Sequence, residues 1–237
     1  MKEIKSQTKE GGFLLVSKPS GITSHDAIDY LRKITKIKKI GHAGTLDPLA
    51  EGLLIVAIGR EYTKRLSLFL KKDKEYIATI KLGEVSDTFD KEGKIEKKKI
   101  KKVPELLEIE DVLIKFVGEI NQIPPIFSAK KVKGKKLYEL ARKGIKVEPE
   151  PTKVKIYELQ ILEYNFPYLK LKVFCSSGTY IRSLANDIGK ELGCGALLES
   201  LKRTKIGEYS LEDAVDLYSL NEKNWKNYLF YEIKEEK

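Results

Sequence analysis

The chain has 237 residues, of which 41% are hydrophobic, so it is long enough to bury a sizeable core. Its 45 Lys and Arg residues outnumber its 35 Asp and Glu residues, which gives a formal net charge of +10. The longest apolar run, Leu53 to Ile58, is too short to span a bilayer, and the polar N-terminus lacks the apolar run of a secretory signal. We therefore expect a soluble, cytoplasmic protein that does not bind membranes.

The first part of the chain reads as a strand followed by a helix. Gly12 to Ser17 is an apolar run typical of a buried strand. Thr23 and Asp26 have the spacing of a capping box, and apolar residues then continue at helical spacing to Ile34. The stretch from Arg32 to Lys39 adds five basic residues and no acidic one.

A glycine-rich loop then precedes the next strand. Gly41 to Thr45 reads as a loop, and Asp47-Pro48 opens a short helical or extended segment that leads to the apolar run. Glu75 to Leu82 alternates apolar and polar residues, which predicts a strand with Tyr76 on its apolar face.

The middle of the chain is strongly basic. Val85 to Lys102 reads as a mobile basic loop, in which the stretch from Lys91 holds seven Lys against two Glu. Val103 to Phe116 is a predicted helix, and the prolines after Ile123 break the chain. Lys130 to Lys146 contains eight bases and one acid, with a short helix expected around Leu137 to Ala141. Clustered bases of this kind suit the phosphates of a nucleic acid, and a solvated lysine-rich face is the alternative.

Val154 to Tyr164 and Tyr168 to Cys175 read as paired strands, and Tyr180 to Leu192 as an amphipathic helix. The glycines in the following Gly193 to Gly195 stretch follow a helix pattern, so they indicate a helix-ending turn and not a nucleotide-binding loop. Strands and helices intermingle without regular alternation. The predicted fold class is α+β, with a mixed, mostly antiparallel central sheet and flanking helices.

Several side chains are candidates for chemistry, each with an ordinary structural alternative. Asp47 precedes Pro48 and could simply cap a helix, but glycines bracket it and would allow a nucleic-acid strand to approach closely. Arg182 lies in the first helical turn, where a cation opposes the helix dipole, and this hints at a partner carboxylate, with an ordinary surface arginine as the alternative. His42 could act as an acid or base, as a loop residue bonded to backbone, or as a wedge among RNA bases. The two Cys and two His residues lack the spacing of a disulfide framework or a zinc site.

Six segments in chain order resemble the motifs of the TruB-type tRNA pseudouridine synthases. Together they cover the chain from about Gly12 to Tyr209, and six ordered motifs make a chance likeness very improbable. The segments read VSKPSGITSHDAI, GHAGTLDPLAEGLLIVAIGREYTK, KEYIATIKLGEVSDTFDKEG, IPPIFSAKKVKGKKLYELARKGIKV, CSSGTYIRSLANDIGKELG and LKRTKIGEY.

The resemblance implies a pseudouridine synthase fold and an isomerase that converts uridine to pseudouridine in the tRNA T-loop, at position fifty-five. It implies no metal, no organic cofactor and no guide RNA. The partner would be the T-arm of tRNA, and the protein a monomer. A guide-RNA-dependent, dyskerin-like enzyme is a weaker match, and a non-catalytic basic RNA-binding or tRNA-folding protein is the alternative from another class.

The resemblance also implies roles for individual residues. Asp47 would be the catalytic nucleophile, Tyr76 would lie against the target base and abstract a proton, and Arg182 would pair with Asp47. Tyr180 and Leu201 would line the pocket, His42 would fill the space of the flipped-out base, and Lys18 would lie beneath the site. The basic segment that includes Lys130 and Arg142 would clamp RNA phosphates.

The motifs predict a catalytic domain over residues 1–210, with an RNA-clamping insertion at about 123–151. Residues 211–237 would form a short helix or tail whose aromatic residues, such as Trp225 and Phe230, pack back on the domain. At about 27 residues this tail is shorter than a small domain, so we expect no full C-terminal RNA-binding domain.

Overall fold

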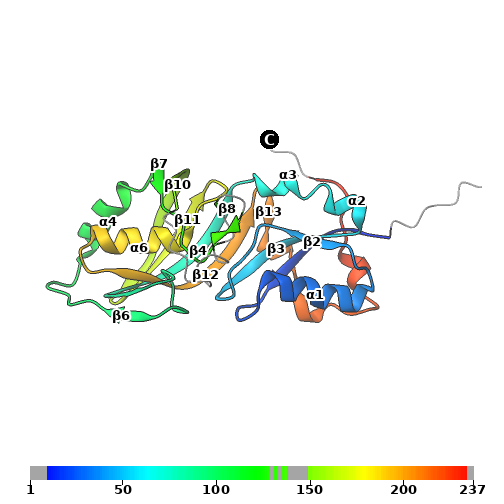
Figure 1. Ribbon diagram of the computed structural model, residues 1–237, viewed down its shortest axis with the longest axis horizontal. Coiled ribbons are helices and arrows are strands. Elements are labelled where there is room, and N and C mark those ends of the chain that lie inside the picture. Colours follow the sequence, from blue (N-terminus) through cyan, green and yellow to red (C-terminus); the bar gives the residue numbers. More distant parts are fainter. Residues whose placement is uncertain (1–9, 129–130, 133–134, 138–148, 234–237) are drawn as a thin grey trace, which may run out of the picture. The chain divides into compact units, whose positions relative to one another are not determined.

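The computed structural model describes residues 10–128, 131–132, 135–137 and 149–233, and Figure 1 shows the elements that they form. The chain folds into two compact units, which are described one at a time. Unit one contains residues up to 72 and from 203 onward, and unit two contains residues 73–202. Within the described ranges, no helix is long and apolar enough to cross a membrane.

Unit one is a mixed sheet with short helices. Its strands are ordered β14-β1-β3-β12, with β2 paired to β3 and β13 paired to β12. Strand β12 (Ala196–Ile206) belongs to unit two up to residue 202 and to unit one from residue 203. The other elements are β1 (Gly12–Lys18), α1 (Ser24–Thr35), β2 (Ile40–Ala43), β3 (Ala50–Ile58), α2 (Arg60–Thr63), α3 (Ser67–Leu70), β13 (Tyr209–Ser210), η1 (Leu211–Asp213), β14 (Val215–Asp216), η2 (Leu217–Ser219) and η3 (Trp225–Tyr228).

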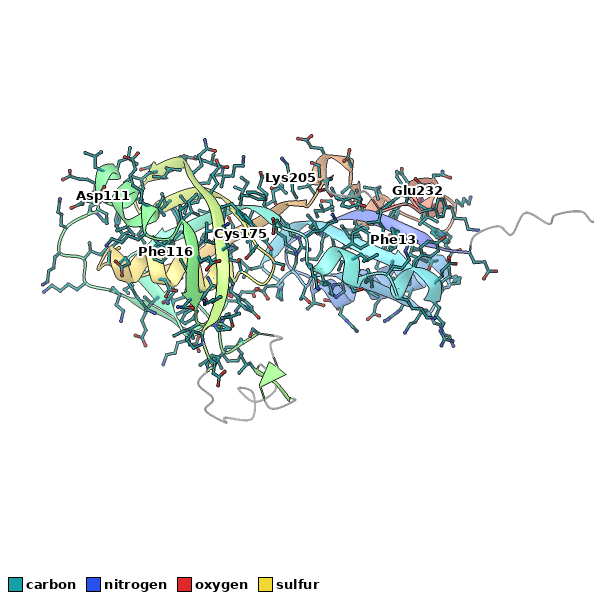
Figure 2. The ribbon with its side chains drawn as sticks, turned by 90° about the horizontal axis from the view of Figure 1, so that it is seen from above. Phe13, Asp111, Phe116, Cys175, Lys205 and Glu232 are labelled. Atoms are coloured by element: carbon teal, nitrogen blue, oxygen red, sulfur yellow. The ribbon has the colours of Figure 1, made fainter. Side chains whose placement is uncertain are left out.

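The alternation of β1 separates two apolar clusters on the two sides of this sheet. Leu14 and Val16 pack with α1 and with the buried Trp225, so residues near the C-terminal end complete this cluster. Phe13, which is labelled in Figure 2, faces the other way and packs with aromatic residues of α2 and α3. The backbone of Phe230 is hydrogen-bonded to that of Phe13 at 2.8 and 2.9 Å. The predicted packing of Trp225 and Phe230 onto the domain is confirmed.

Unit two is a sheet in the order β12-β4-β11-β10-β7, in which the pairs from β4 to β7 are antiparallel, and α4 and α6 pack on it (Figure 1). In β4, residues alternate between buried and half-buried, as the sequence predicts, because one face lies under the helices. Two short hairpins, β5–β6 and β8–β9, complete the unit. The elements are β4 (Lys74–Leu82), β5 (Glu84–Ser86), β6 (Ile95–Lys97), α4 (Leu106–Ile114), β7 (Gly118–Gln122), β8 (Lys131–Val132), β9 (Lys135–Lys136), β10 (Thr152–Asn165), β11 (Tyr168–Cys175) and α6 (Ile181–Glu191).

The sequence interpretation is confirmed for the long elements and is wrong for several short ones. The predicted loop from Gly41 to Thr45 begins as part of strand β2, which pairs with β3. The capping box of Thr23 and Asp26 begins α1, and β10 pairs with β11. The stretch from Val85 to Lys102 is not simply a loop, because Glu84–Ser86 pairs with Ile95–Lys97 in a hairpin. The region after Leu211 forms 3-10 turns and the short strand β14 instead of an α-helix. The predicted α+β class with a mixed, mostly antiparallel sheet is confirmed.

Candidate functional site

Asp47 lies in the turn between β2 and β3 of unit one, and its side chain is half-buried. The N–H of Ala50 donates to the Asp47 carbonyl at 3.0 Å, which closes the turn through Pro48 and starts β3. The Asp47-Pro48 segment, predicted to be helical or extended, is instead a tight turn. The carboxylate is thus carried on a tight turn at the start of a buried strand.

This turn is anchored on both sides of Asp47 by Gly21, before α1, and by Ser24, the first residue of α1. The buried Ser24 hydroxyl accepts from the Leu46 N–H at 2.9 Å and lies 3.1 Å from the Leu46 carbonyl, to which it can donate. The N–H of Gly21 donates to the Pro48 carbonyl at 2.8 Å. Because the residues before and after Asp47 are both held, the backbone that carries its carboxylate is fixed by the fold.

Lys18, at the end of β1, is fully buried beside this turn. Its ammonium donates to the carbonyls of Pro19 and Ile22 at 2.8 and 2.7 Å. Burial and, secondarily, the charge of Arg203 lower the pKa of Lys18 from 10.5 to about 8, against a smaller opposing effect of Asp47. In neutral solution Lys18 is therefore still charged, and it adds positive potential near the Asp47 carboxylate.

We expect the stability that Lys18 confers to rise with pH. Because its pKa is about 8 in the folded chain and 10.5 ordinarily, the unfolded chain binds more protons between these values. Below a pH of about 8, the folded chain bears the whole free-energy cost of burying the charged ammonium. This cost falls away as the pH rises from about 8 to 10.5. The free energy of unfolding of the wild type should therefore increase relative to Lys18→Met over this interval. Urea unfolding followed by Trp225 fluorescence measures the free energy of unfolding of both proteins. If the difference between them does not change with pH, the lowered pKa of Lys18 is wrong.

His42 lies on β2 and is also near Arg203. Burial, then the Arg203 charge, lowers the pKa of His42 below its ordinary 6.5, so the imidazole is neutral in neutral solution. Its Nδ1 atom is buried and has no hydrogen-bond partner among the residues that the structure describes. A buried polar nitrogen of this kind has an unused capacity for a hydrogen bond.

Arg203 is the largest of the fully buried side chains, and it connects β12 to the Asp47 turn within unit one. Its guanidinium donates to the carbonyls of Leu53 and Gly44 at 2.8 and 3.0 Å. Gly52, directly across from it on β3, has φ +105, and a Cβ there would overlap the Arg203 carbonyl oxygen. The close packing of these two strands therefore requires glycine at position 52.

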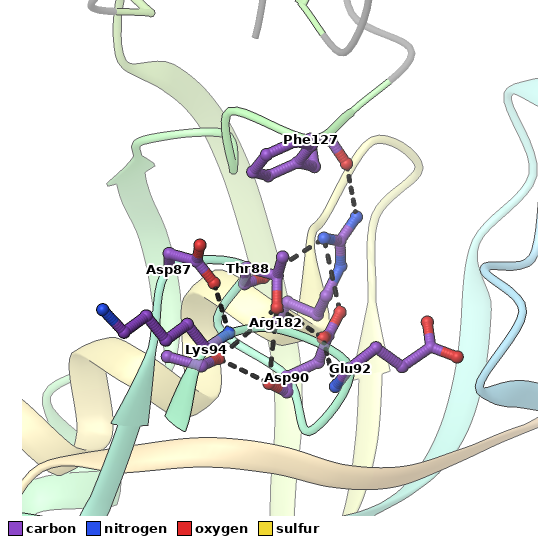
Figure 3. A network of polar contacts seen from close by, with 8 residues as sticks. Asp87, Thr88, Asp90, Glu92, Lys94, Phe127 and Arg182 are labelled. Atoms are coloured by element: carbon purple, nitrogen blue, oxygen red, sulfur yellow. Dashed lines mark hydrogen bonds and ion pairs between the residues drawn. The ribbon is translucent and has the colours of Figure 1, made fainter. Parts of the chain in front are cut away.

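In unit two, Arg182 is the buried centre of a polar network at the start of α6. Its guanidinium donates to the carbonyls of Thr88 and Phe127 at 3.2 and 3.0 Å, and it lies 3.5 Å from the Asp90 carboxylate. Figure 3 shows these contacts converging on the guanidinium from two loops. The sequence predicted a carboxylate partner for Arg182. The structure provides one in Asp90, which lies in the turn of the β5–β6 hairpin. The pairing of Arg182 with Asp47 stays a prediction.

The loop that carries Asp90 is itself well ordered by hydrogen bonds (Figure 3). Asp90 Oδ1 accepts from the Thr88 hydroxyl at 2.6 Å and from the Glu92 N–H at 3.0 Å. Asp87 accepts from the Lys94 N–H at 2.8 Å, and this bond closes the turn. The charge of Arg182 is therefore balanced by a carboxylate whose own position is fixed.

Gln122 holds Tyr180, the N-cap residue of α6, through both of its backbone groups. The side-chain amide of Gln122 accepts from the Tyr180 N–H at 2.7 Å and donates to the Tyr180 carbonyl at 3.0 Å. One turn later, the Ser183 hydroxyl donates to the Ile123 carbonyl at 2.7 Å. The chain leaving β7 is thus attached to the start of the helix that carries Arg182.

The remaining predicted site residues fall into three groups. Tyr76 on β4 and Leu201 on β12 are both 8% exposed, so most of each side chain lies within the protein. Tyr180 is half-buried. Lys130 and Arg142 lie outside the described residues, as does most of the predicted clamp.

Two residues of these networks were missed by the sequence reasoning. Asp90 stands in an acidic stretch next to a strand, and the search for a carboxylate partner of Arg182 could have pointed to it. Arg203 carries no local signal, because its importance comes from burial against β3. The described part of the chain contains no group of three or more His, Cys, Asp or Glu side chains that could hold a metal ion.

Comparison with protein-family models gives two adjacent matches. Residues 32–181 match the TruB family pseudouridylate synthase (N terminal domain), which is more than half of the chain. Residues 182–234 match the tRNA pseudouridylate synthase B C-terminal domain. The second match begins at Arg182, within α6 of unit two, and continues into the C-terminal part of unit one.

Similar proteins are found among curated sequences and solved structures. The tRNA pseudouridine synthase B of Clostridium tetani is 47% identical over 92% of this chain and 75% of the relative. The protein of the same name from Chlamydia felis is 49% identical over 90% of each chain.

A chain in the structure of an H/ACA RNP bound to a substrate RNA containing 2'-deoxyuridine is 29% identical, with a TM-score of 0.68. A chain in the crystal structure of a Cbf5-Nop10-Gar1 complex is 32% identical, also with a TM-score of 0.68. This chain spans 55% and 53% of those two chains, about half of their length. Taken with the match to residues 32–181, these likenesses show that the chain belongs to the TruB family of pseudouridylate synthases.

Proposed function

We propose that this protein isomerises a uridine of tRNA to pseudouridine, with Asp47 as the nucleophile. The observation that carries the proposal is the anchored turn, in which hydrogen bonds hold the residues on both sides of Asp47. The relatives named tRNA pseudouridine synthase B, at 47–50% identity, support tRNA as the substrate. We further propose the T-loop uridine at position fifty-five as the target and a monomer without guide RNA as the working form.

The reaction breaks the glycosidic N–C bond, rotates the uracil and forms a C–C bond to the same ribose, so no atom is gained or lost. A carboxylate suits this sequence, because it can form a bond to the substrate and later leave. Asp47 must be ionised to do so, and the positive charge of Lys18 near it favours the ionised form.

The Arg182 cluster would supply the other polar groups. A guanidinium that already has Asp90 and two carbonyls as partners is held in one orientation, which suits it to contact a carboxylate or the substrate in a fixed geometry. Tyr76 would lie against the target base and abstract a proton, and Tyr180 and Leu201 would line the pocket.

The target uridine lies within folded RNA, so it must be flipped out before it can react, at a cost of a few kcal/mol. The neutral imidazole of His42 can stack in the space that the base leaves, and its unpaired Nδ1 can accept or donate a hydrogen bond there. We propose that His42 has this role in the complex with tRNA.

Incubation of the purified protein with an unmodified tRNA transcript tests the proposal. Pseudouridine has the same mass as uridine, so it is read by chemical labelling before mass spectrometry, and we expect one labelled site in the T-loop. A folded transcript that stays unmodified at saturating protein would overturn the proposal and favour a non-catalytic RNA-binding protein.

Ser24 should act as a positioning residue for Asp47. Ser24→Ala removes the hydroxyl that bonds both backbone groups of Leu46, and it leaves these buried groups unpaired at a cost of about 1–3 kcal/mol. We expect kcat to fall about tenfold, because misplacing a catalytic group by a fraction of an ångström is costly, while KM for tRNA changes little.

The matched control for this experiment is Ser20→Ala. Ser20 is exposed and makes one bond to the same loop, donating to the Leu49 carbonyl at 2.9 Å, whereas the buried Ser24 hydroxyl bonds both backbone groups of Leu46. Equal losses of kcat in the two variants would contradict a special role for Ser24.

A further inference from the structure

Unit two contains a hollow that the networks described above do not use. It has a volume of about 540 Å³ and lies between the β5–β6 hairpin and the C-terminal end of α6. The side chains that matter most for its chemistry are Phe89, Lys98, Lys99 and Lys190, and the backbone of Gly195 forms part of its wall. The hollow therefore combines one aromatic ring with three lysines.

Two of these lysines have no counter-charge. Lys98 and Lys99 form no ion pair with any residue that the structure describes, and both side chains are exposed. Lys190 lies 3.3 Å from Asp187, with its ammonium 5.9 Å from the centre of the Phe89 ring. Unpaired ammonium groups around a concave surface favour binding of an anion there.

Other lysines of the same unit are already neutralised by glutamates. Lys102 lies 3.0 Å from Glu108, and Lys115 lies 3.0 Å from Glu191. Lys98 and Lys99 therefore lack the glutamate partners that Lys102 and Lys115 have.

The wall of the hollow is held in place by tight backbone packing. Gly195 has φ +72, and a Cβ there would lie 2.8 Å from the Val85 side chain and 3.0 Å from that of Lys98. The Gly83 N–H donates to the Gly195 carbonyl at 2.9 Å, and the Lys98 N–H donates to the Gly83 carbonyl at 2.9 Å. The backbone that carries Lys98 is therefore fixed against the end of α6.

The hollow is directly connected to the Arg182 cluster through one residue. Phe89 has φ +64, which is unusual for a bulky side chain, and its ring lines the hollow. Its two neighbours, Thr88 and Asp90, contact Arg182. One loop thus contributes to the Arg182 network with two residues and to the hollow with the residue between them.

We propose that this hollow binds a phosphate and its ribose from the backbone of the substrate tRNA, outside the target nucleotide. This inference rests on the proposed function, because an RNA held at Arg182 brings its phosphates close to the same loop. Lys98 and Lys99 would neutralise phosphate charge, and the Phe89 ring would pack against the sugar. Each neutralised phosphate releases bound counterions, so this contact should depend strongly on salt.

The test is the variant Lys98→Gln/Lys99→Gln, assayed by equilibrium filter binding of an unmodified tRNA transcript over a series of salt concentrations. We expect the Kd to rise at least about tenfold near 0.1 M salt. The slope of log affinity against log salt concentration should become less negative by about one to two. The charge-conserving variant Lys98→Arg/Lys99→Arg should keep most of the affinity.

The matched control is Lys102→Gln/Lys115→Gln, which removes the same formal charge from lysines that already have glutamate partners. We expect its Kd to stay within about twofold of the wild type, because those charges are already compensated. Equal weakening in both Gln pairs, or none in the first, would overturn the proposal. The assay needs no turnover, so a wild type that binds tRNA without forming pseudouridine would refute the proposed function and leave this site standing.

Discussion

Replacing Asp47 with Asn is expected to abolish pseudouridine formation while tRNA binding is largely kept. The amide is close in size to the carboxylate and leaves the anchored turn intact, but it cannot serve as an anionic nucleophile. We expect kcat to fall to below about one-thousandth of the wild-type value. Single-turnover labelling of pseudouridine measures the rate, and filter binding measures the affinity.

The control for this experiment is Asp111→Asn. Asp111 is exposed on α4 (Figure 2), and its loss changes the net charge in the same way. We expect wild-type activity from this variant. Substantial turnover by Asp47→Asn would refute the nucleophile assignment, and a similar defect in both variants would point to a general charge effect.

Gly52→Ala should be the most destabilising single substitution considered, with a loss of about 4 kcal/mol or more in the free energy of unfolding. A Cβ at position 52 would overlap the Arg203 carbonyl and lie 2.9 Å from the Arg203 nitrogen, and φ +105 is strained for alanine. The strands β3 and β12 would have to separate, and the Arg203 bond to Gly44 would weaken with them.

Trp225 is the one tryptophan of the chain and lies in the core of the same unit, so its fluorescence during urea unfolding reports the effect. Gly21→Ala is the matched control, because Gly21 has φ +89 but no atom lies within 4 Å of the added methyl group. The free energy of unfolding of Gly21→Ala should fall by only about 1–2 kcal/mol, which is the cost of placing alanine in a left-handed backbone conformation. A similar loss in both variants would show that contact with β12 does not matter.

The long elements could be predicted because their signals are local. The alternation in Glu75 to Leu82 and the capping box at Thr23 each depend on residues within one turn or one strand, and both are confirmed. The polar hairpin around Asp90 was missed, because β5 and β6 are short and one of them is fully exposed. Their pairing is stabilised by side-chain bonds in the turn, which a hydrophobic pattern does not reveal.

The candidate site was predictable only in part, because its contacts join residues that are far apart in the sequence. The unfavourable place of Arg182 in the first turn of α6 indicated a carboxylate partner, and the acidic stretch around Asp90 offered candidates, but only the tertiary fold shows which of them lies beside Arg182. Arg203 was not predicted at all, because its role arises from bonds to Gly44 and Leu53, on segments far away in sequence. Contacts of this kind depend on the tertiary fold.

The bonds from Ser24 and Gly21 to the Asp47 turn also have a consequence for the thermodynamics of catalysis. The loss of conformational entropy in this loop occurs when the chain folds, so it need not be repeated at each encounter with RNA. Warming should therefore accelerate turnover mainly through the activation enthalpy of the bond-breaking steps, until unit one begins to melt.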